Sequence, residues 1–500
     1  MCRADIRMSD MGTTAYRAGE KQGLGTHWAV AAGHPLAVRA AQAMLELKGS
    51  AVDAAIAADA VMGVVEPMAT GIGGDLLAMI APPDSMPVAY NGSGAAPLLL
   101  NAEHVQALPG GRIPERHVLS ITTPGLVRGW WDMHQRYGRL DWAHLFQPAI
   151  QAAREGFAVA PVAAREWQIF DFVLHRDPVC AALYRAGKPP KAGEQYRNPE
   201  LAAVLEEIAA QGPDAFYLGR PAQHAEQAME QMQGLLRAED FRRHKGFFCE
   251  PVSASLGEFS LYECPPNTHG VAVLEAVQRA WKRPVDQDAA ELELVKATEA
   301  AMAQASRVVC DPAGNTVCTV VVDADGLAVT FMSSIFKRFG SGYAVPGCGF
   351  VLQNRGFGFS EPGHVNGPGP GKRPYHTVVP SLALKSGQFH MGLGVVGGLM
   401  QPQGQIQIWT RVLRDGWPLD KAMFEPRWRL EGAGRLALED GFDANRTAFL
   451  REHGYVPPDK GVGELAGRSD FGGAQAVERL ADGRLQAVSD PRKDGCVALA

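Results

Sequence analysis

The 500-residue sequence lacks the features that mark several common protein classes. It has no excess of basic charge, because 48 Lys and Arg residues stand against 54 Asp and Glu residues, and no basic run occurs. Nucleic-acid binding is therefore not expected. No apolar run reaches the roughly 18 residues of a membrane-spanning helix, and the polar N-terminal segment lacks a signal-peptide core. We expect a cytoplasmic protein with no membrane partner.

The sequence also lacks the usual marks of metal and cofactor sites. Its eight cysteines are scattered without a C-x-x-C pair or a matching histidine spacing, which favours small buried thiols over a zinc site or a disulfide scaffold. The G-x-G-x-x-G pattern at Gly392–Gly397 has no βαβ unit around it. The G-x-S-x-G and H-E-x-x-H motifs are absent. We expect neither an organic cofactor nor a metal.

The patterns that are present predict a layered α/β protein. Residues 32–65 predict two helices separated by Gly49, the second of them apolar enough to be buried on every side. Residues 126–310 read mainly as helices joined by loops. A change of composition near residues 310–316 introduces β-rich runs around Asp325-Gly326, which predict a hairpin.

One tripeptide at this change has a chemical interpretation. Gly314-Asn315-Thr316 stands directly before a predicted strand, where a threonine can simply be a β-branched residue that opens the strand. If the preceding peptide bond is cut, however, Thr316 carries both a nucleophilic hydroxyl and an α-amine that can accept its proton. Gly314 would let the backbone adopt the strained geometry of an internal attack. Spacing alone does not choose between the two interpretations.

Several segments, in the same order along the chain, decide between the two interpretations of Thr316. Through these segments the sequence resembles the γ-glutamyltransferase family of N-terminal-nucleophile hydrolases over nearly its whole length. The segments are GSAVDAAIAADAVMGVVEPMATGIGGD (49–75), TTPGLVRGW (122–130), GNTVCTVVVDADGLAV (314–329), FGSGYAVPGCGFVLQNRGFGFS (339–360), GKRPYHTVVPSLAL (371–384), VVGGLMQPQG (395–404), EPRW (425–428) and FGGAQAV (471–477).

The resemblance implies a four-layer α/β/β/α sandwich that self-cleaves before Thr316. Residues 1–315 would form a mostly helical half and residues 316–500 a β-rich half, intertwined in one domain. After the helix expected at 290–306, only the segment Cys310–Asn315 precedes Thr316. This segment is shorter than the one that usually precedes the nucleophile in the family, so an uncut chain remains an alternative. We expect the cleaved halves to stay associated, with a homodimer as the assembly to test.

The resemblance also assigns site residues. Thr316 matches the nucleophile, and Gly397 and Gly398 match the glycine pair whose amides form the oxyanion hole. Ser334 stands where a hydroxyl residue assists the nucleophile. His376 and Thr377 fall on a hydroxyl pair that contacts the γ-glutamyl carboxylate, so that Thr377 keeps one of the two hydroxyls.

The sequence departs from the family at the γ-glutamyl headgroup. Ser93 replaces the arginine that clamps the α-carboxylate, and Gly358 replaces the carboxylate that holds the α-ammonium. Phe336 replaces a neighbouring asparagine. Nearby cations could receive an anionic group instead, or could be solvated loop charges. These cations are Lys337, Arg338 and Arg355.

The sequence therefore predicts a threonine-dependent amide hydrolase or acyltransferase without a cofactor, with hydrolysis favoured over transfer. Its partner would be a small-molecule amide, either a γ-glutamyl compound such as glutathione or a related amide. The alternatives are an amidohydrolase for a small carboxylated, oxamate-like amide and an uncleaved homologue that only binds a ligand.

Overall fold

Two seven-stranded antiparallel sheets form the centre of the molecule. The computed structural model describes residues 16–282, 286–308, 315–432, 434–458 and 471–500. The first sheet has the order β1 (Gln22–Gly25), β17 (Leu485–Ser489), β16 (Gly473–Arg479), β13 (Gln388–Val396), β12 (Ser381–Lys385), β9 (Phe259–Glu263) and β8 (Val252–Leu256). The second has the order β18 (Cys496–Leu499), β2 (Ala29–Ala32), β10 (Asn315–Val322), β11 (Ala328–Phe336), β3 (Asp75–Ala81), β4 (Val88–Asn91) and β7 (Phe247–Cys249).

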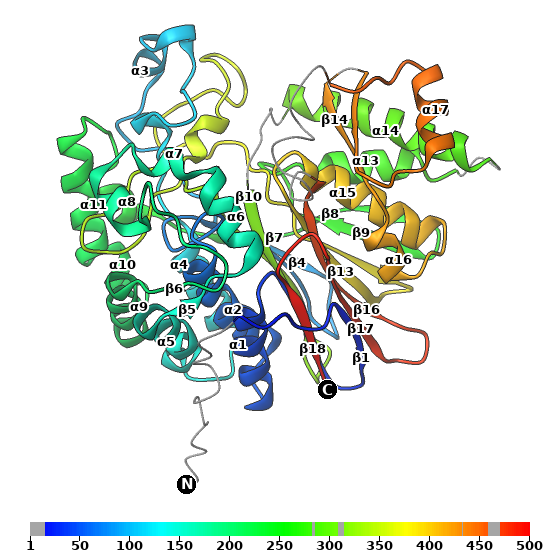
Figure 1. Cartoon of the computed structure of the whole chain (residues 1–500), viewed down its shortest axis with the longest axis horizontal. Coiled ribbons are helices and arrows are strands. Elements are labelled where there is room, and N and C mark those ends of the chain that lie inside the picture. The colour runs from blue at the N-terminus through cyan, green and yellow to red at the C-terminus, as the bar shows by residue number, and fades with distance from the viewer. Residues whose placement is uncertain (1–15, 283–285, 309–314, 433, 459–470) are drawn as a thin grey trace.

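Helices cover the outer face of each sheet, as Figure 1 shows. The second sheet is covered from the N-terminal half, by helices that include α1 (Pro35–Glu46), α2 (Ala51–Val65), α4 (Leu126–Tyr137), α5 (Gln147–Glu155) and α9 (Pro199–Gln211). The first sheet is covered by α13 (Gly270–Arg279), α14 (Gln287–Val308), α15 (Met400–Trp409) and α16 (Leu419–Phe424). A third apolar cluster fills the space between the sheets. The predicted four-layer α/β/β/α sandwich is confirmed.

The remaining elements are shorter or lie outside these layers. The helices are α3 (Ala102–Gln106), α6 (Pro161–Ile169), α7 (Asp171–Leu174), α8 (Pro178–Tyr184), α10 (Asp214–Tyr217), α11 (Arg220–Gln231), α12 (Ala238–Arg243) and α17 (Ala444–Glu452). Two small sheets pair β5 (Phe157–Ala158) with β6 (Gln195–Tyr196), and β14 (Trp428–Gly432) with β15 (Arg435–Leu438).

The local predictions for the N-terminal half hold with one exception. Gly49 separates α1 from α2, and Ser50 caps α2 in a reciprocal pair with Asp53. Every residue of α2 except Gly63 is buried, as its composition predicts. The interpretation of residues 126–310 as mainly helical misses β7, β8 and β9, which join the two large sheets. These short strands lie toward the sheet edges and depend on pairing with distant segments, so that local periodicity marks them weakly.

The predicted hairpin places Thr316 at a bend in the second sheet. β10 and β11 pair across the Asp325-Gly326 turn, and the register shifts between Asn315 and Val317. One residue, Thr316, therefore stands opposite the two residues Ser334 and Ile335. Such β-bulges are frequent beside active sites because they re-aim a side chain.

The sheets approach each other closely where β13 crosses this hairpin. A Cβ atom on Gly392 would lie 2.8 Å from Thr330 Oγ1 and 3.0 Å from Val320 Cγ1, and one on Gly394 would lie 2.9 Å from Met332 Sδ. Gly392 and Gly394 of the G-x-G-x-x-G pattern therefore allow the backbone of β13 to pack directly against side chains of the hairpin. Two residues further along β13, the chain reaches Val396 and then Gly397.

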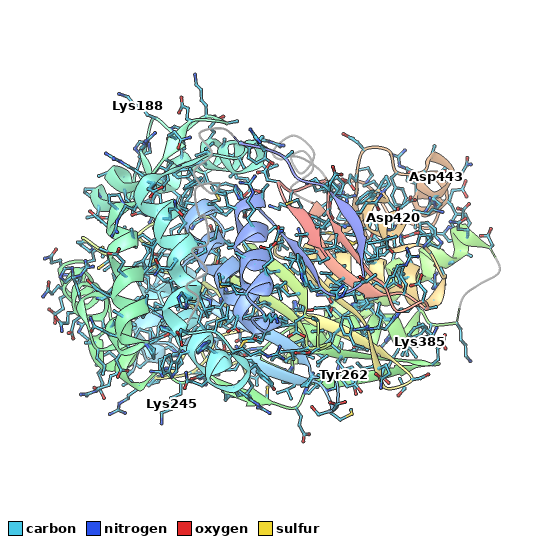
Figure 2. The ribbon with its side chains drawn as sticks, turned by 90° about the horizontal axis from the view of Figure 1, so that it is seen from below. Lys188, Lys245, Tyr262, Lys385, Asp420 and Asp443 are labelled. Atoms are coloured by element: carbon cyan, nitrogen blue, oxygen red, sulfur yellow. The ribbon has the colours of Figure 1, made fainter. Side chains whose placement is uncertain are left out.

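The surface carries charge of both signs. Lys188, Lys245 and Lys385 are exposed and project at separate edges in Figure 2. Among the helices of the described ranges, none combines the length and apolar character needed to cross a bilayer. The described cysteines are all free thiols, and all except Cys249 are buried.

Candidate active site

Thr316 is buried between the sheets, with only 1% of its surface exposed. Its hydroxyl lies 2.7 Å from the side-chain amide of Gln401 on α15. Both the nitrogen and the oxygen of the Gln401 amide have hydrogen-bond partners in one orientation. In that orientation the nitrogen donates to the carbonyls of Thr377 (2.9 Å) and Val395 (3.3 Å). Its oxygen then accepts the hydrogen bond of the Thr316 hydroxyl. The candidate nucleophile is thus held in one orientation.

Gly397 and Gly398 connect β13 to α15 with backbone that favours glycine. Their φ angles are +118° and +63°, values that side chains with a Cβ atom rarely adopt. Both carbonyls point into the first turn of α15, where they accept hydrogen bonds from Met400 (3.1 Å) and Gln401 (3.0 Å). Within the described ranges, neither glycine N–H donates to a protein acceptor. These amides at a helix N-terminus have the chemistry of an oxyanion hole.

Arg355 is a fully buried cation with spare hydrogen-bond donors. Its Nη1 makes a long contact of 3.5 Å with Thr377 Oγ1, and its Cζ lies 4.3 Å from the centre of the Phe336 ring. Its Nε and Nη2 have no hydrogen-bond partner among the described residues. Burial lowers the pKa of Arg355 to about 10, against the opposing effect of Asp75, so the guanidinium stays protonated near neutral pH.

Asp75 at the start of β3 organises the groups behind Arg355. Its Oδ2 lies 3.6 Å from Arg355 Nε and 3.3 Å from His376 Nε2. Its Oδ1 accepts hydrogen bonds from the N–H groups of Gly94 and Gly125 and from Gln353. Burial alone would raise the pKa of Asp75, but the contacts with His376 and Arg355 outweigh it and lower that pKa.

His376 is neutral in this environment. Burial, helped by the charge of Arg355, lowers the pKa of His376 to about 4 although Asp75 opposes the shift. Its Nδ1 accepts a hydrogen bond from the N–H of Val378 at 3.2 Å. His376 therefore helps to orient Asp75, while the next residue, Thr377, lies between Arg355 and Gln401.

The remaining candidates lie beside this group. Ser334 stands in the bulge opposite Thr316, and its Oγ accepts a hydrogen bond from the N–H of Phe336 at 2.8 Å. Ser93 Oγ donates to Asn91 Oδ1 at 2.7 Å, so this hydroxyl is bound within the structure. A Cβ atom on Gly358 would lie 3.3 Å from the Tyr375 carbonyl oxygen, which is a tight contact with the backbone.

Arg338, in contrast, belongs to a separate ion-pair cluster. Its guanidinium binds Glu166 of α6, and Lys493 Nζ lies 3.1 Å from the same carboxylate. Lys337 lies 3.4 Å from Glu115. The interpretation of Arg338 and Arg355 as solvated loop charges is wrong, because both side chains are buried. The two arginines nevertheless differ, since a carboxylate binds Arg338 at close range.

Sequence reasoning missed two central residues, Gln401 and Asp75. The glutamines of the MQPQGQIQ segment and the aspartate after the glycine turn were visible signals, but their partners lie far away in the sequence. The predictions for Gly314 and for the Cys310–Asn315 tether concern residues outside the described ranges, apart from the backbone pairing of Asn315. The described residues contain no group of three or more metal-ligating side chains.

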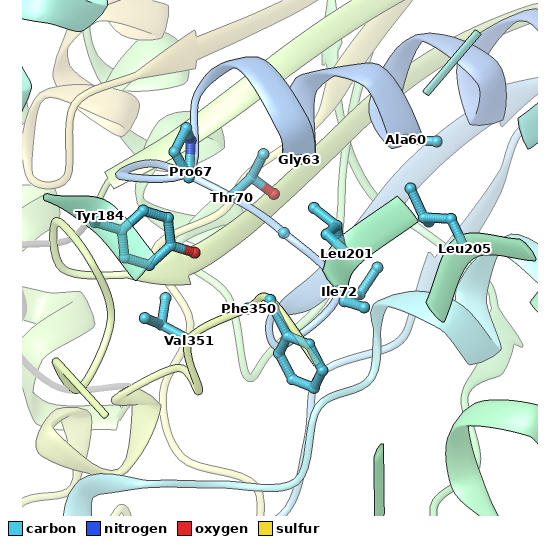
Figure 3. Close-up of a pocket in the computed structure, with 12 residues that line it drawn as sticks. Ala60, Gly63, Pro67, Thr70, Ile72, Tyr184, Leu201, Leu205, Phe350 and Val351 are labelled. Carbon is cyan, nitrogen blue, oxygen red and sulfur yellow. The ribbon is translucent and has the colours of Figure 1, made fainter. Parts of the chain in front are cut away.

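A small hollow between α2, α9 and residues 349–351 is distinct from this site. It is lined mostly by apolar side chains, including Ile72, Leu201 and Phe350 (Figure 3). Its volume of about 10 Å³ has room for a single water molecule. Thr70, which lines it, hydrogen-bonds Ser333 Oγ at 2.6 Å on the helix-facing side of β11.

Comparisons with known proteins identify the family to which the chain belongs. The profile of the family described as Gamma-glutamyltranspeptidase matches residues 37–314 and 282–500. The chain is 32% identical to an oxamate amidohydrolase proenzyme of Klebsiella pneumoniae, over 95% of this chain and 98% of that one. It is 31% identical to the glutathione hydrolase-like YwrD proenzyme of Bacillus subtilis, over 95% of this chain and 99% of that one.

A solved structure extends the similarity to the whole fold. The cephalosporin acylase from Bacillus halodurans matches with a TM-score of 0.90 and 29% identity, over 97% of this chain and 98% of that one. The relatives named here are a glutathione hydrolase-like protein, an oxamate amidohydrolase and a cephalosporin acylase. The chain belongs to the gamma-glutamyltranspeptidase family and is an amidohydrolase of its N-terminal-nucleophile class.

Proposed function

We propose that this protein cleaves itself before Thr316 and then hydrolyses a small amide that carries a carboxylate close to the scissile carbonyl. The observation that carries the proposal is the buried Arg355, whose Nε and Nη2 lack partners among the described residues. A buried cation with unused N–H donors is costly unless a ligand binds them, and a carboxylate matches the guanidinium fork. The oxamate amidohydrolase relative acts on such a small anionic amide.

Self-cleavage would start with attack of Thr316 Oγ1 on the carbonyl carbon of Asn315. The peptide C–N bond breaks, the hydroxyl proton passes to the leaving nitrogen, and an ester links Asn315 to Thr316. Water then hydrolyses the ester, which leaves a carboxylate on Asn315 and a free α-amine on Thr316. The Klebsiella pneumoniae and Bacillus subtilis relatives are both named as proenzymes, which supports this step.

Turnover would use the new α-amine as the base. It accepts the proton of Oγ1 while Oγ1 attacks the substrate carbonyl, and the N–H groups of Gly397 and Gly398 bind the oxyanion. Collapse expels the amine, which takes the proton from the α-ammonium, and leaves an acyl-enzyme. Water repeats the sequence and releases the carboxylic acid. Arg355 would hold the substrate carboxylate throughout.

A γ-glutamyl compound is the second candidate substrate, because the Bacillus subtilis relative is named as glutathione hydrolase-like. The headgroup residues favour the smaller amide. Ser93 is neutral and its hydroxyl is bound to Asn91, and Gly358 offers no carboxylate to a substrate ammonium. The two positions at which the family resemblance places charges for a glutamyl zwitterion therefore carry none.

The two products of cleavage would be chains of 315 and 185 residues from the 500-residue precursor. They should stay associated, because both large sheets contain strands from either side of residue 315. Separating the chains would expose the apolar cluster between the sheets. A ligand-binding homologue that remains uncut would instead migrate as one band.

The test combines cleavage and turnover. Purified wild-type protein should give two bands and a new N-terminus at Thr316, whereas Thr316→Ala should stay intact and inactive. Oxamate should be hydrolysed with a higher kcat/KM than a γ-glutamyl anilide. Gly398→Val should lower the rate by about 10²-fold or more, the cost of losing an oxyanion donor. An active protein with only its original N-terminus would disprove the nucleophile assignment.

A further inference from the structure

Helix α15 is unusual because it is buried on every side and still carries four glutamines. They alternate along the helix as Gln401, Gln403, Gln405 and Gln407. Gln403 and Gln407 each bind both the N–H and the carbonyl of one residue of β14, at Leu430 and Trp428. These amides complete the backbone hydrogen bonds of β14 and fix the position of the helix.

The other two glutamines face the segment before β12. Gln405 donates to the carbonyl of Val379, and one helical turn earlier Gln401 donates to the carbonyl of Thr377. The two side chains are therefore matched in helix, burial and backbone partner. They differ because the Gln401 nitrogen also donates to the carbonyl of Val395 at 3.3 Å and the Gln401 oxygen accepts the hydrogen bond of the Thr316 hydroxyl at 2.7 Å.

The direction of this hydrogen bond is set by the surroundings of Gln401. The carbonyls of Thr377 and Val395 can only accept, so the amide nitrogen must face them and the oxygen must face Thr316. The hydroxyl then donates to Gln401, and its lone pairs point elsewhere. An amide oxygen is too weak a base to remove the proton, so its effect is on orientation.

We propose that Gln401 is the positioning residue that holds the Thr316 hydroxyl for attack, both in self-cleavage and in turnover. This role rests on the proposed function of Thr316. Thr377 links the same amide to Arg355, because its carbonyl binds Gln401 and its hydroxyl lies 3.5 Å from the guanidinium. Gln401 thus positions the nucleophile relative to the group that would hold the substrate.

The experiment compares Gln401→Met with Gln405→Met, since methionine keeps the length of the side chain and removes the amide. Gln401→Met should slow self-cleavage and lower kcat by roughly tenfold to a hundredfold with little change in KM, the scale of a misplaced reacting group. Gln405→Met should cleave and turn over at nearly the wild-type rate while losing similar thermal stability. Self-cleavage is read on a gel and requires no knowledge of the substrate.

A second variant keeps the test sharp if Gln401→Met folds poorly. Gln401→Glu can replace the amide only while its carboxyl is protonated, because an ionised carboxylate cannot donate to the Thr377 carbonyl. Its self-cleavage should therefore match the wild type at low pH and fall behind as the pH rises. A rate ratio that stays constant with pH would contradict the positioning role.

The outcomes separate the two proposals. If Thr316→Ala protein still cleaves, the proposed nucleophile is wrong and the role of Gln401 fails with it. If Thr316→Ala blocks cleavage but Gln401→Met and Gln405→Met cleave at equal rates, the nucleophile stands and only the role of Gln401 is overturned.

Discussion

Two arginines of this protein are equally buried and differently bonded. Arg355 and Arg427 are both 0% exposed, each lies beside a buried aspartate, and burial lowers the pKa of each to about 10. Arg427 donates to Asp490 (2.6 Å) and to the carbonyls of Phe471 (2.9 Å) and Met423 (3.0 Å). Among the described residues, the polar contacts of Arg355 are a long one with Thr377 and a distance of 3.6 Å to Asp75.

The difference separates a structural arginine from one available to a ligand. Asp490 also accepts hydrogen bonds from the N–H of Ala474 and from Arg492, so the Arg427 cluster ties strand β16 to the segment before β14. The Arg355 side chain is equally enclosed but leaves two donors unused among the described residues. Burial alone therefore does not assign a role to a charged residue, whereas the balance of donors and acceptors does.

The largest expected effect is on activity, from Arg355→Met. Each charge-assisted hydrogen bond to a carboxylate contributes roughly 1.5–3 kcal/mol, so losing two should lower kcat/KM for an anionic amide by about two to four decades. Self-cleavage should continue, because it involves no free carboxylate substrate. Steady-state kinetics with oxamate test this, and an unchanged kcat/KM would remove the distinction between the two arginines.

Arg427→Met should act on stability instead. It removes the Arg427 donor from the Phe471 carbonyl, leaves the Met423 carbonyl with Arg492 as its side-chain donor, and weakens the pairing of Asp490. The expected cost is roughly 3–5 kcal/mol in the free energy of unfolding. Urea denaturation of matched samples provides the measurement. Arg355→Met is the control, and it should lose clearly less stability because the Oδ1 atom of Asp75 keeps its three hydrogen-bond donors.

Asp59 is a buried aspartate that, unlike the aspartates beside Arg355 and Arg427, has hydroxyl and indole groups as its hydrogen-bond donors. Burial raises the pKa of Asp59 to about 7, although Ser333 and Trp130 donate hydrogen bonds to it. The folded protein keeps this proton between pH 4 and 7, where the unfolded chain has lost it, so stability should fall as the pH rises through that window. Asp59→Asn should remove a fall on the order of 3–4 kcal/mol. Parallel pH profiles for both proteins would refute the assignment.

The smallest expected effect is a gain of function at the headgroup. Ser93→Arg combined with Gly358→Asp restores the two charges that a γ-glutamyl zwitterion requires, and should raise kcat/KM for a γ-glutamyl anilide by about tenfold. The expected increase in kcat/KM is small because Ser93 is buried and a longer side chain must displace its neighbours. The single substitutions are the controls, and equal rates for all variants would mean that other residues bind the headgroup.

The sequence predicted the features that depend on neighbours in the chain. The hairpin around Asp325-Gly326 and the two helices beside Gly49 are local patterns, and the family resemblance supplied the sandwich. The role of Gln401 was not predicted, because its partner Thr316 lies 85 residues away. The burial of Arg338 was missed for the same reason, since it depends on Glu166, 172 residues earlier.

The glycines of β13 set the separation of the two large sheets, on which the proposed chemistry of Thr316 would depend. Gly392 and Gly394 let the two sheets pack closely at β13, which ends at Val396, and at β10, which begins at Asn315. Because a glycine backbone is already the smallest contact surface available, any substitution there can only widen the separation. Substitutions at these core positions would therefore only lengthen the distance across which the Thr316 hydroxyl must attack. A mutation outside the substrate site would then be measured as a loss of rate.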